Sequence, residues 1–227
     1  MRAFDYFLRD WRYRIAAPYI QKGSSVLDIG GYDGSFLQLV GDRIARGVCI
    51  DPLAEERSSG RISFVRMRLT DALPFPDSSF DVVTMLAVFE HLGAQRDAIV
   101  AEAARILRQG GLAVLTIPTP AVDSILRVLE AVRIVDADTL DEHQHAGMAE
   151  TIELFAHCGL DLKRRARFQL GLNNFFIFEK RGTGRDPATG RDVVSISEAA
   201  ALPTARLSRR PCSLHGNRTS PGNGDRP

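Results

Sequence analysis

The chain has 227 residues and a formal net charge of +1, and 44% of its residues are hydrophobic and 25% charged. These values are ordinary for a soluble globular protein and give no overall case for binding nucleic acid or an anionic membrane. No apolar run approaches the ~20 residues of a membrane-spanning helix, so no membrane span is predicted.

A helix is predicted over residues 2–21, where aromatic and aliphatic side chains recur at steps of three and four residues. We expect it to pack on a sheet, with Arg9, Arg12 and Arg14 in solvent; a lid over a binding site is the alternative. The segment lacks a small-residue cleavage site, so no secretory signal is expected. The three cysteines are widely scattered, which predicts no disulfide framework and favours a reducing, cytoplasmic setting.

The next stretch, residues 26–37, reads VLDIGGYDGSFL. Its apolar start predicts a buried parallel strand, and helical spacing from Phe36 onward predicts a helix. Gly30, Gly31 and Gly34 lie between the two, at the turn. Such a turn directs backbone N–H groups and a helix N-terminus at a ligand above the strand end. Glycine is needed there for positive φ or for close approach of a ligand.

Asp28 separates two kinds of ligand for this turn. A carboxylate at the mouth would repel a nucleotide phosphate and attract a cation. S-adenosylmethionine carries a sulfonium and an ammonium and no phosphate, so it fits better than NAD. The glycine spacing also departs from the dinucleotide pattern Gly-x-Gly-x-x-Gly.

This stretch resembles the first motif, VLDxGxGxG, of the class I seven-stranded S-adenosylmethionine-dependent methyltransferases, specifically a methyltransferase type 11-like domain. Tyr32 stands where the middle glycine is common. The resemblance implies that Asp28 lies near the methionine end of the cofactor, and that Gly30, Gly31, Tyr32 and Gly34 form the cofactor turn. An ordinary tight turn in an α/β domain is the alternative.

A second strand is predicted at residues 47–50 and ends at Asp51-Pro52. An acidic residue just past the second strand is the expected partner of a ribose diol, because a carboxylate accepts two hydroxyl hydrogen bonds. Pro52 restricts Asp51 to extended geometry. A surface aspartate in a turn is the alternative.

A third strand is predicted at residues 62–65 and leads to Asp71 and Ala72. The resemblance implies that these two residues lie beside the adenine, with the Asp71 carboxylate accepting from the exocyclic amine. A polar loop with a turn aspartate is the alternative.

A fourth strand is predicted at residues 80–86, within the run FDVVTMLAVFEHL, which resembles the family's fourth motif. The carboxyl ends of strands one and four flank the topological switch point, so Leu86 and Ala87 are expected to line the methionine end. His91 follows directly. It is a candidate general base for the acceptor, and a structural hydrogen bond is an equal alternative.

The remaining pattern is architectural. Residues 97–107 predict a helix stopped by Gly110 and Gly111, and residues 112–117 predict a buried strand. A helix at 149–158 and strands at 160–168 and 174–180 follow. The resemblance implies a Rossmann-like doubly wound α/β fold with strand order 3-2-1-4-5-7-6 and an antiparallel last strand.

His143 and His145 lie in a polar loop beside two acidic residues. They lack the spacing of a recognisable zinc site, so we expect no metal. A solvated loop is one interpretation, and binding of the acceptor is the other.

We therefore expect a methyltransferase domain at residues 1–181 and a disordered tail at 182–227, which has no Phe, Trp or Tyr. The expected reaction moves a methyl group from S-adenosylmethionine to an O, N or C nucleophile of a small-molecule, lipid or sugar-type acceptor. The sequence has no basic stripe with interleaved aromatic residues, so no binding of nucleic acid is predicted. A non-catalytic cofactor-binding module and a nicotinamide-dependent oxidoreductase are the alternatives.

Overall fold

The computed structural model describes residues 3–69, 72–119 and 147–182. The strands in these ranges are β1 (Ser24–Ile29), β2 (Ile44–Asp51), β3 (Arg57–Ser59), β4 (Ile62–Arg66), β5 (Phe80–Leu86), β6 (Leu107–Pro118), β7 (Leu160–Phe168) and β8 (Asn173–Lys180). The α-helices are α1 (Ala3–Ala16), α2 (Ser35–Leu39), α3 (Arg96–Ile106) and α5 (Met148–His157), and the 3₁₀ turns are η1 (Ala17–Tyr19), η2 (Phe89–His91) and η3 (Gly93–Gln95).

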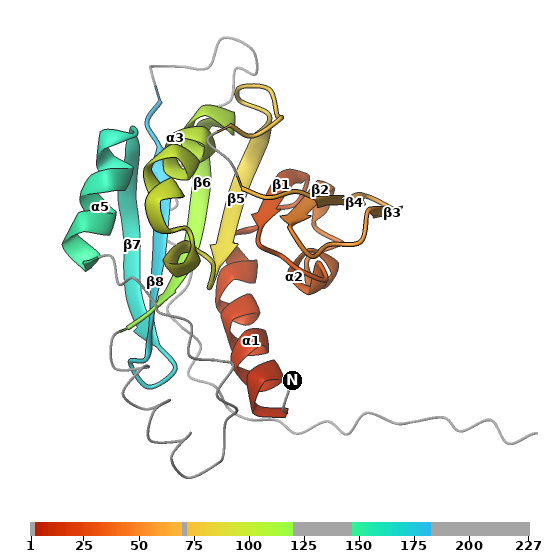
Figure 1. Cartoon of the computed structure of the whole chain (residues 1–227), viewed down its shortest axis with the longest axis horizontal. Helices are drawn as coiled ribbons and strands as arrows, with labels where there is room; N and C mark the ends of the chain where they lie inside the picture. Colours follow the sequence, from red (N-terminus) through yellow and green to blue (C-terminus); the bar gives the residue numbers. More distant parts are fainter. Residues whose placement is uncertain (1–2, 70–71, 120–146, 183–227) are drawn as a thin grey trace, which may run out of the picture. The chain divides into compact units, whose positions relative to one another are not determined.

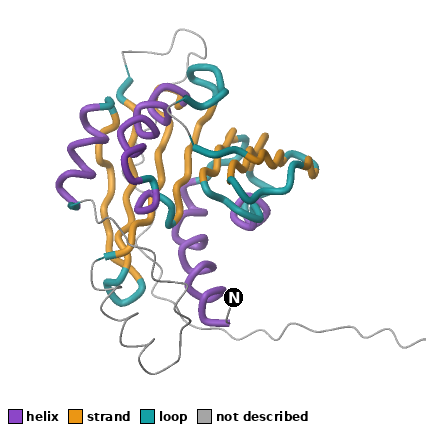
Figure 2. Tube along the Cα trace, in the orientation of Figure 1, coloured by secondary structure: helices purple, strands orange, loops and turns teal. Residues whose placement is uncertain are grey.

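The strands form one sheet (Figure 2), and their order is β3-β4-β2-β1-β5-β6-β8-β7, as labelled in Figure 1. The pairings β4-β2, β2-β1, β1-β5 and β5-β6 are parallel, whereas β8 is antiparallel to both β6 and β7. Without the edge strand β3, this is the predicted order 3-2-1-4-5-7-6 with an antiparallel last strand. The predicted Rossmann-like fold is therefore confirmed.

Each face of the sheet is covered by helices, and each carries its own apolar core (Figure 1). One core joins the sheet to α3 and α5, with Ile99, Val100 and Phe155 fully buried. The other joins it to the C-terminal end of α1 and to α2, with Phe36 and Leu37 fully buried. Burial on both faces explains the continuous apolar runs of the parallel strands.

The prediction of a glycine helix stop after α3 was wrong. The helix ends at Ile106, and Gly110 and Gly111 lie inside β6. The pairing with β5 shifts register between Phe80 and Val82, so the β6 glycines form an irregularity in the ladder. A Cβ on Gly111 would lie 3.0 Å from the Asp81 carbonyl oxygen, which explains the glycine there.

Two further features concern the edge of the sheet and the C-terminal end of the described chain. Strand β3 was not predicted; its residues are polar and all exposed, and it pairs antiparallel with β4. The predicted tail lies outside the described residues apart from Gly182, so the predicted domain boundary stays a prediction. Within the described ranges, no helix has the length and apolar character needed to cross a membrane.

Candidate functional site

The carboxyl ends of β1 and β5 meet where the strand order of the sheet reverses, and the glycine turn follows β1 at this point. Gly30 and Gly34 have φ of +71° and +69°. A Cβ on Gly30 would collide with the Val88 side chain, and one on Gly34 would collide with the Phe64 ring. Both glycines are therefore required by the protein's own packing, independently of any ligand.

Tyr32 keeps the conformation that a glycine would have at its position. Its φ is +46°, in the left-handed region, and its side chain is 53% exposed. Its backbone N–H donates to Asp51 Oδ2 at 3.2 Å. The turn thus retains its path despite the tyrosine, and the phenol ring projects from it.

Asp28 lies beneath the turn. Its carboxylate is 2% exposed and accepts a hydrogen bond from Thr84 Oγ1 at 2.5 Å. A Cβ on Gly31 would collide with Asp28 Oδ2, so the turn packs directly on this carboxylate. Burial raises the pKa of Asp28 to about 7; the nearby charges of Asp51 and Asp33 add to the rise, and the Thr84 hydrogen bond opposes it.

Asp51 ends β2 beside the turn and is 8% exposed. Its Oδ1 accepts from the Leu53 N–H at 2.7 Å, and its Oδ2 accepts from the Tyr32 N–H. Each carboxylate oxygen can accept more than one hydrogen bond, so both retain capacity for hydroxyl donors. Pro52, the next residue, is exposed.

The end of β5 supplies another wall of the site. Ala87 has φ of +60°, an uncommon value for alanine, and its N–H donates to the Thr116 carbonyl oxygen at 3.1 Å. The chain then forms η2, in which the N–H of His91 donates to the Val88 carbonyl oxygen. The His91 side chain is exposed.

A cavity of about 340 Å³ lies over these strand ends, between them and α1. Its lining residues come from α1, the glycine turn and the end of β5: Asp5, Leu8, Arg9, Arg12, Tyr13, Gly30, Gly31, Tyr32, Asp33, Leu86 and Ala87. The structure thus brings Gly30, Gly31, Tyr32, Leu86 and Ala87 together as predicted neighbours. Asp28, Gly34, Asp51 and His91 do not belong to this lining.

Three predicted site residues lie outside the described ranges: Asp71, His143 and His145. Their proposed contacts with adenine and acceptor stay predictions. Ala72 is described and exposed. Among the described residues, no group of three or more His, Cys, Asp or Glu side chains could hold a metal ion.

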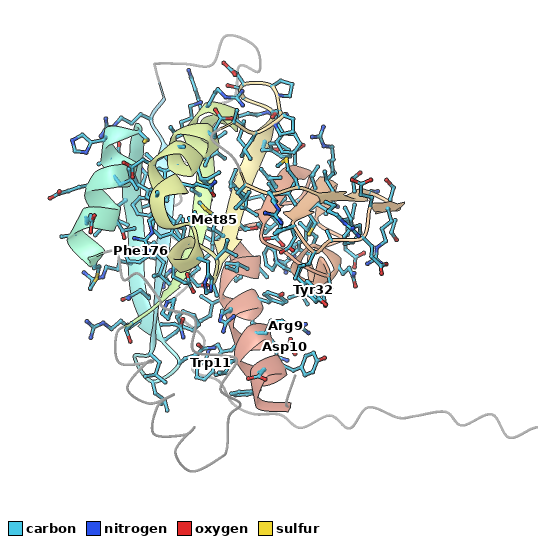
Figure 3. All side chains as sticks on the ribbon, in the orientation of Figure 1. Arg9, Asp10, Trp11, Tyr32, Met85 and Phe176 are labelled. Atoms are coloured by element: carbon cyan, nitrogen blue, oxygen red, sulfur yellow. The ribbon has the colours of Figure 1, made fainter. Side chains whose placement is uncertain are left out.

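Helix α1 packs on the sheet through one side and faces the cavity with another. Trp11 packs edge-on against Phe168, with ring centroids 6.5 Å apart, as the aromatic stripe predicted. In Figure 3, Arg9 and Tyr32 lie on one side of this helix and Trp11 on the other. The Gln169 Nε2 donates to the Leu8 carbonyl oxygen at 2.7 Å, which ties the helix to the turn between β7 and β8.

The prediction that all three arginines of α1 are solvated was wrong for two of them. Arg9 reaches Asp33 of the glycine turn at 3.4 Å, and its guanidinium lies 4.8 Å from the Tyr6 ring centroid. Arg12 is partly buried, and its Nε has no hydrogen-bond partner in the described structure. Arg14 is exposed as predicted. The i, i+3 spacing of Arg9 and Arg12 was the signal in the sequence that these two side chains share one face of the helix.

Glu90 is a further residue that the sequence did not single out. It is 5% exposed, and its Oε2 has no hydrogen-bond partner within the described ranges. Burial raises the pKa of its carboxyl to about 7, and the positive charges of Arg12 and Arg96 oppose the rise. Burial also lowers the pKa of Arg12, which the Glu90 charge opposes. The two side chains therefore interact across the space between α1 and η2.

The chain is similar to known methyltransferases. The model of the family described as "Methyltransferase domain" matches residues 27–115. The chain is 33% identical over 121 residues to the ubiquinone/menaquinone biosynthesis C-methyltransferase UbiE of Stenotrophomonas maltophilia, covering 46% of this chain and 47% of the relative. The chain thus spans about half the length of the curated relatives it matches.

Solved structures agree on the fold. An S-adenosylmethionine-dependent methyltransferase from Methanosarcina mazei matches with a TM-score of 0.56 and 21% identity, over 74% of this chain and 98% of that one. The 1,6-didemethyltoxoflavin-N1-methyltransferase of Burkholderia thailandensis, solved with its substrate and S-adenosylhomocysteine, matches with a TM-score of 0.58 and 14% identity, over 78% and 82%. At these identities the likeness establishes the fold alone.

Proposed function

We propose that the chain, whose residues 27–115 match the methyltransferase-domain family model, binds S-adenosylmethionine and transfers its methyl group to a small-molecule acceptor. The observation that carries the proposal is the cavity at the switch point, which the glycine turn and the end of β5 line together. Ligands of open parallel sheets bind in this crevice.

The residues present fit the cofactor. Asp51 holds the ribose diol, because both of its oxygens retain acceptor capacity beside the glycine turn. Leu86 and Ala87 contact the methionine end from the β5 wall. Asp28 acts from beneath the turn, where its carboxylate favours a cationic group above it. Asp71, which lies outside the described residues, and Ala72 stay the predicted neighbours of the adenine.

When bound, S-adenosylmethionine supplies a methyl carbon that an acceptor nucleophile takes by displacing the sulfonium sulfur, and the electron pair of the broken bond stays on sulfur. The protein's task is therefore orientation and exclusion of water. Helix α1 covers the cavity and is held there by the Gln169 hydrogen bond and the Arg9–Asp33 ion pair. His91 is exposed just after the β5 end and stays a candidate general base for the acceptor.

The acceptor atom is an oxygen, a nitrogen or a carbon. The S. maltophilia relative is a C-methyltransferase of ubiquinone and menaquinone biosynthesis, which favours carbon. A lipid or sugar-linked acceptor is compatible with this proposal, and His143 and His145 stay candidates for contacting it.

Calorimetric titration with S-adenosylhomocysteine, with NADH as the control ligand, tests the proposal. We expect micromolar binding of S-adenosylhomocysteine and no binding of NADH. Failure of S-adenosylhomocysteine to bind would contradict the proposed cofactor. Binding without turnover on any acceptor would instead support a non-catalytic cofactor-binding module.

A further inference from the structure

Two arginines of α1 line the cavity, but they are placed differently. Arg9 reaches the glycine turn: its guanidinium lies 3.4 Å from Asp33 and over the rings of Tyr6 and Tyr13, although its Nε, like that of Arg12, is buried without a hydrogen-bond partner within the described ranges. Arg12 lies one helical turn further along, where its charge interacts with Glu90 of η2, next to the end of β5. Arg9 thus lies at the glycine-turn side of the cavity and Arg12 at the β5 side.

Arg12 is incompletely satisfied in this position. Its Nε is buried and has no hydrogen-bond partner within the described ranges. Its neighbour Glu90 has a buried Oε2 that also has no partner there, so these two atoms do not bond to each other. A buried donor without a partner is costly, and a specific case in a native structure calls for an explanation. A ligand that supplies an acceptor oxygen in the cavity is such an explanation.

The chemistry of the guanidinium restricts the chemical class of that ligand. Its donors match the two oxygens of a carboxylate or a phosphate, and such charge-assisted bonds are roughly twice as strong as neutral ones. The charges of Glu90 and, more weakly, of Asp5 act on Arg12. The Glu90 carboxylate compensates the Arg12 charge only in part, because burial raises the pKa of that carboxyl to about 7. The β5 side of the cavity therefore favours an acidic oxygen group.

We infer that Arg12 binds an acidic oxygen group of the methyl acceptor, so that the acceptor is a small molecule carrying a carboxylate or a phosphate. This inference rests on the proposed function, because it assigns the remaining part of the cavity to the acceptor once the cofactor is in place.

The test uses the full chain saturated with S-adenosylhomocysteine, titrated at constant ionic strength with benzoate, phenyl phosphate and neutral benzamide. We expect benzoate or phenyl phosphate to bind at least about tenfold more tightly than benzamide, which reflects one charge-assisted hydrogen bond. Tighter binding of benzoate would indicate a carboxylate site, and tighter binding of phenyl phosphate would indicate a phosphate site. Arg12→Gln should reduce the preference to within about twofold, and the matched control Arg14→Gln, at an exposed position of the same helix, should retain it.

Three results would overturn the inference. The first is equal binding of the anions and benzamide by the wild-type chain, and the second is a preference that survives Arg12→Gln. The third is that Arg12→Gln weakens the binding of S-adenosylhomocysteine but not that of 5′-methylthioadenosine, which lacks the amino-acid group. Arg12 would then bind the methyl donor and not the acceptor. If Arg12→Gln does not fold, the double variant Arg12→Met with Glu90→Gln removes both buried charges together and must show the same loss of preference. Absence of S-adenosylhomocysteine binding by the wild-type chain would instead refute the proposed function.

Discussion

The left-handed backbone at Tyr32 provides a prediction that two substitutions can isolate. A non-glycine residue at φ of +46° costs about 1–2 kcal/mol relative to the right-handed region. Glycine removes this cost but gains freedom in the unfolded chain, which offsets about 0.4–1 kcal/mol. Alanine retains the cost and removes only the ring, which is 53% exposed. The variant Tyr32→Gly should therefore be more stable than Tyr32→Ala by about 0.5–1 kcal/mol.

Urea unfolding of the two variants side by side measures this difference as a shift of the midpoint at unchanged slope. Comparing the variants with each other cancels the loss of the ring, which both share. Both should keep the hydrogen bond from the backbone of residue 32 to Asp51, so their affinities for S-adenosylhomocysteine should agree within about twofold. The reasoning fails if Tyr32→Ala is as stable as Tyr32→Gly, because residue 32 would then not need a positive φ.

Three further predictions follow from the same site. Asp51→Ala should weaken S-adenosylhomocysteine binding by about 1.5–3 kcal/mol, the range for hydrogen bonds to a charged group, whereas exposed Asp42→Ala should have no effect; equal affinities in calorimetry would refute the ribose assignment. Because Asp28 has a pKa near 7 in the folded protein and near 4 in the unfolded chain, the folded state binds its proton more tightly, so its contribution to stability falls from pH 4 to 7 and is constant above. Between pH 5 and pH 8 this fall amounts to about 2.5 kcal/mol, which Asp28→Asn should remove in urea unfolding, and parallel pH profiles would contradict the assigned burial. Gly34→Ala should cost about 2 kcal/mol or more, from its positive φ and the Phe64 collision, against about 1 kcal/mol for Gly60→Ala, whose added Cβ would meet nothing within 4 Å; thermal unfolding compares the two, and equal losses would refute the packing role.

The strands that the sequence predicted best are those whose signals are local. Strands β5 and β7 begin and end at the predicted residues, because apolar or alternating runs are bounded there by turn residues. Gly110 and Gly111 were misassigned to a helix end because their role depends on pairing with β5, some thirty residues away in sequence. The edge strand β3 was missed because its exposed polar residues carry no hydrophobic pattern.

The same distinction applies to the site. The turn and the end of β5 were predicted because both motifs lie next to their strands in sequence. The burial of Arg9 and Arg12 was not predicted. The groups with which they interact, Asp33 and Glu90, come close to α1 only in the folded chain. Asp28 was expected at the mouth of the turn and lies beneath it, since the buried run of β1 does not reveal how closely the following turn folds back.

The position of β8 between β6 and β7 determines the order in which the sheet can be completed. Strand β7 pairs with β8 and with no other described strand, so it has no place in the sheet until β8 exists. During synthesis, β6 therefore exposes an unpaired, strongly apolar edge from Leu112 to Pro118 until residues 173–180 have left the ribosome. Open edges of this kind recruit other chains. A chain truncated before residue 173 should consequently aggregate rather than fold into a smaller domain.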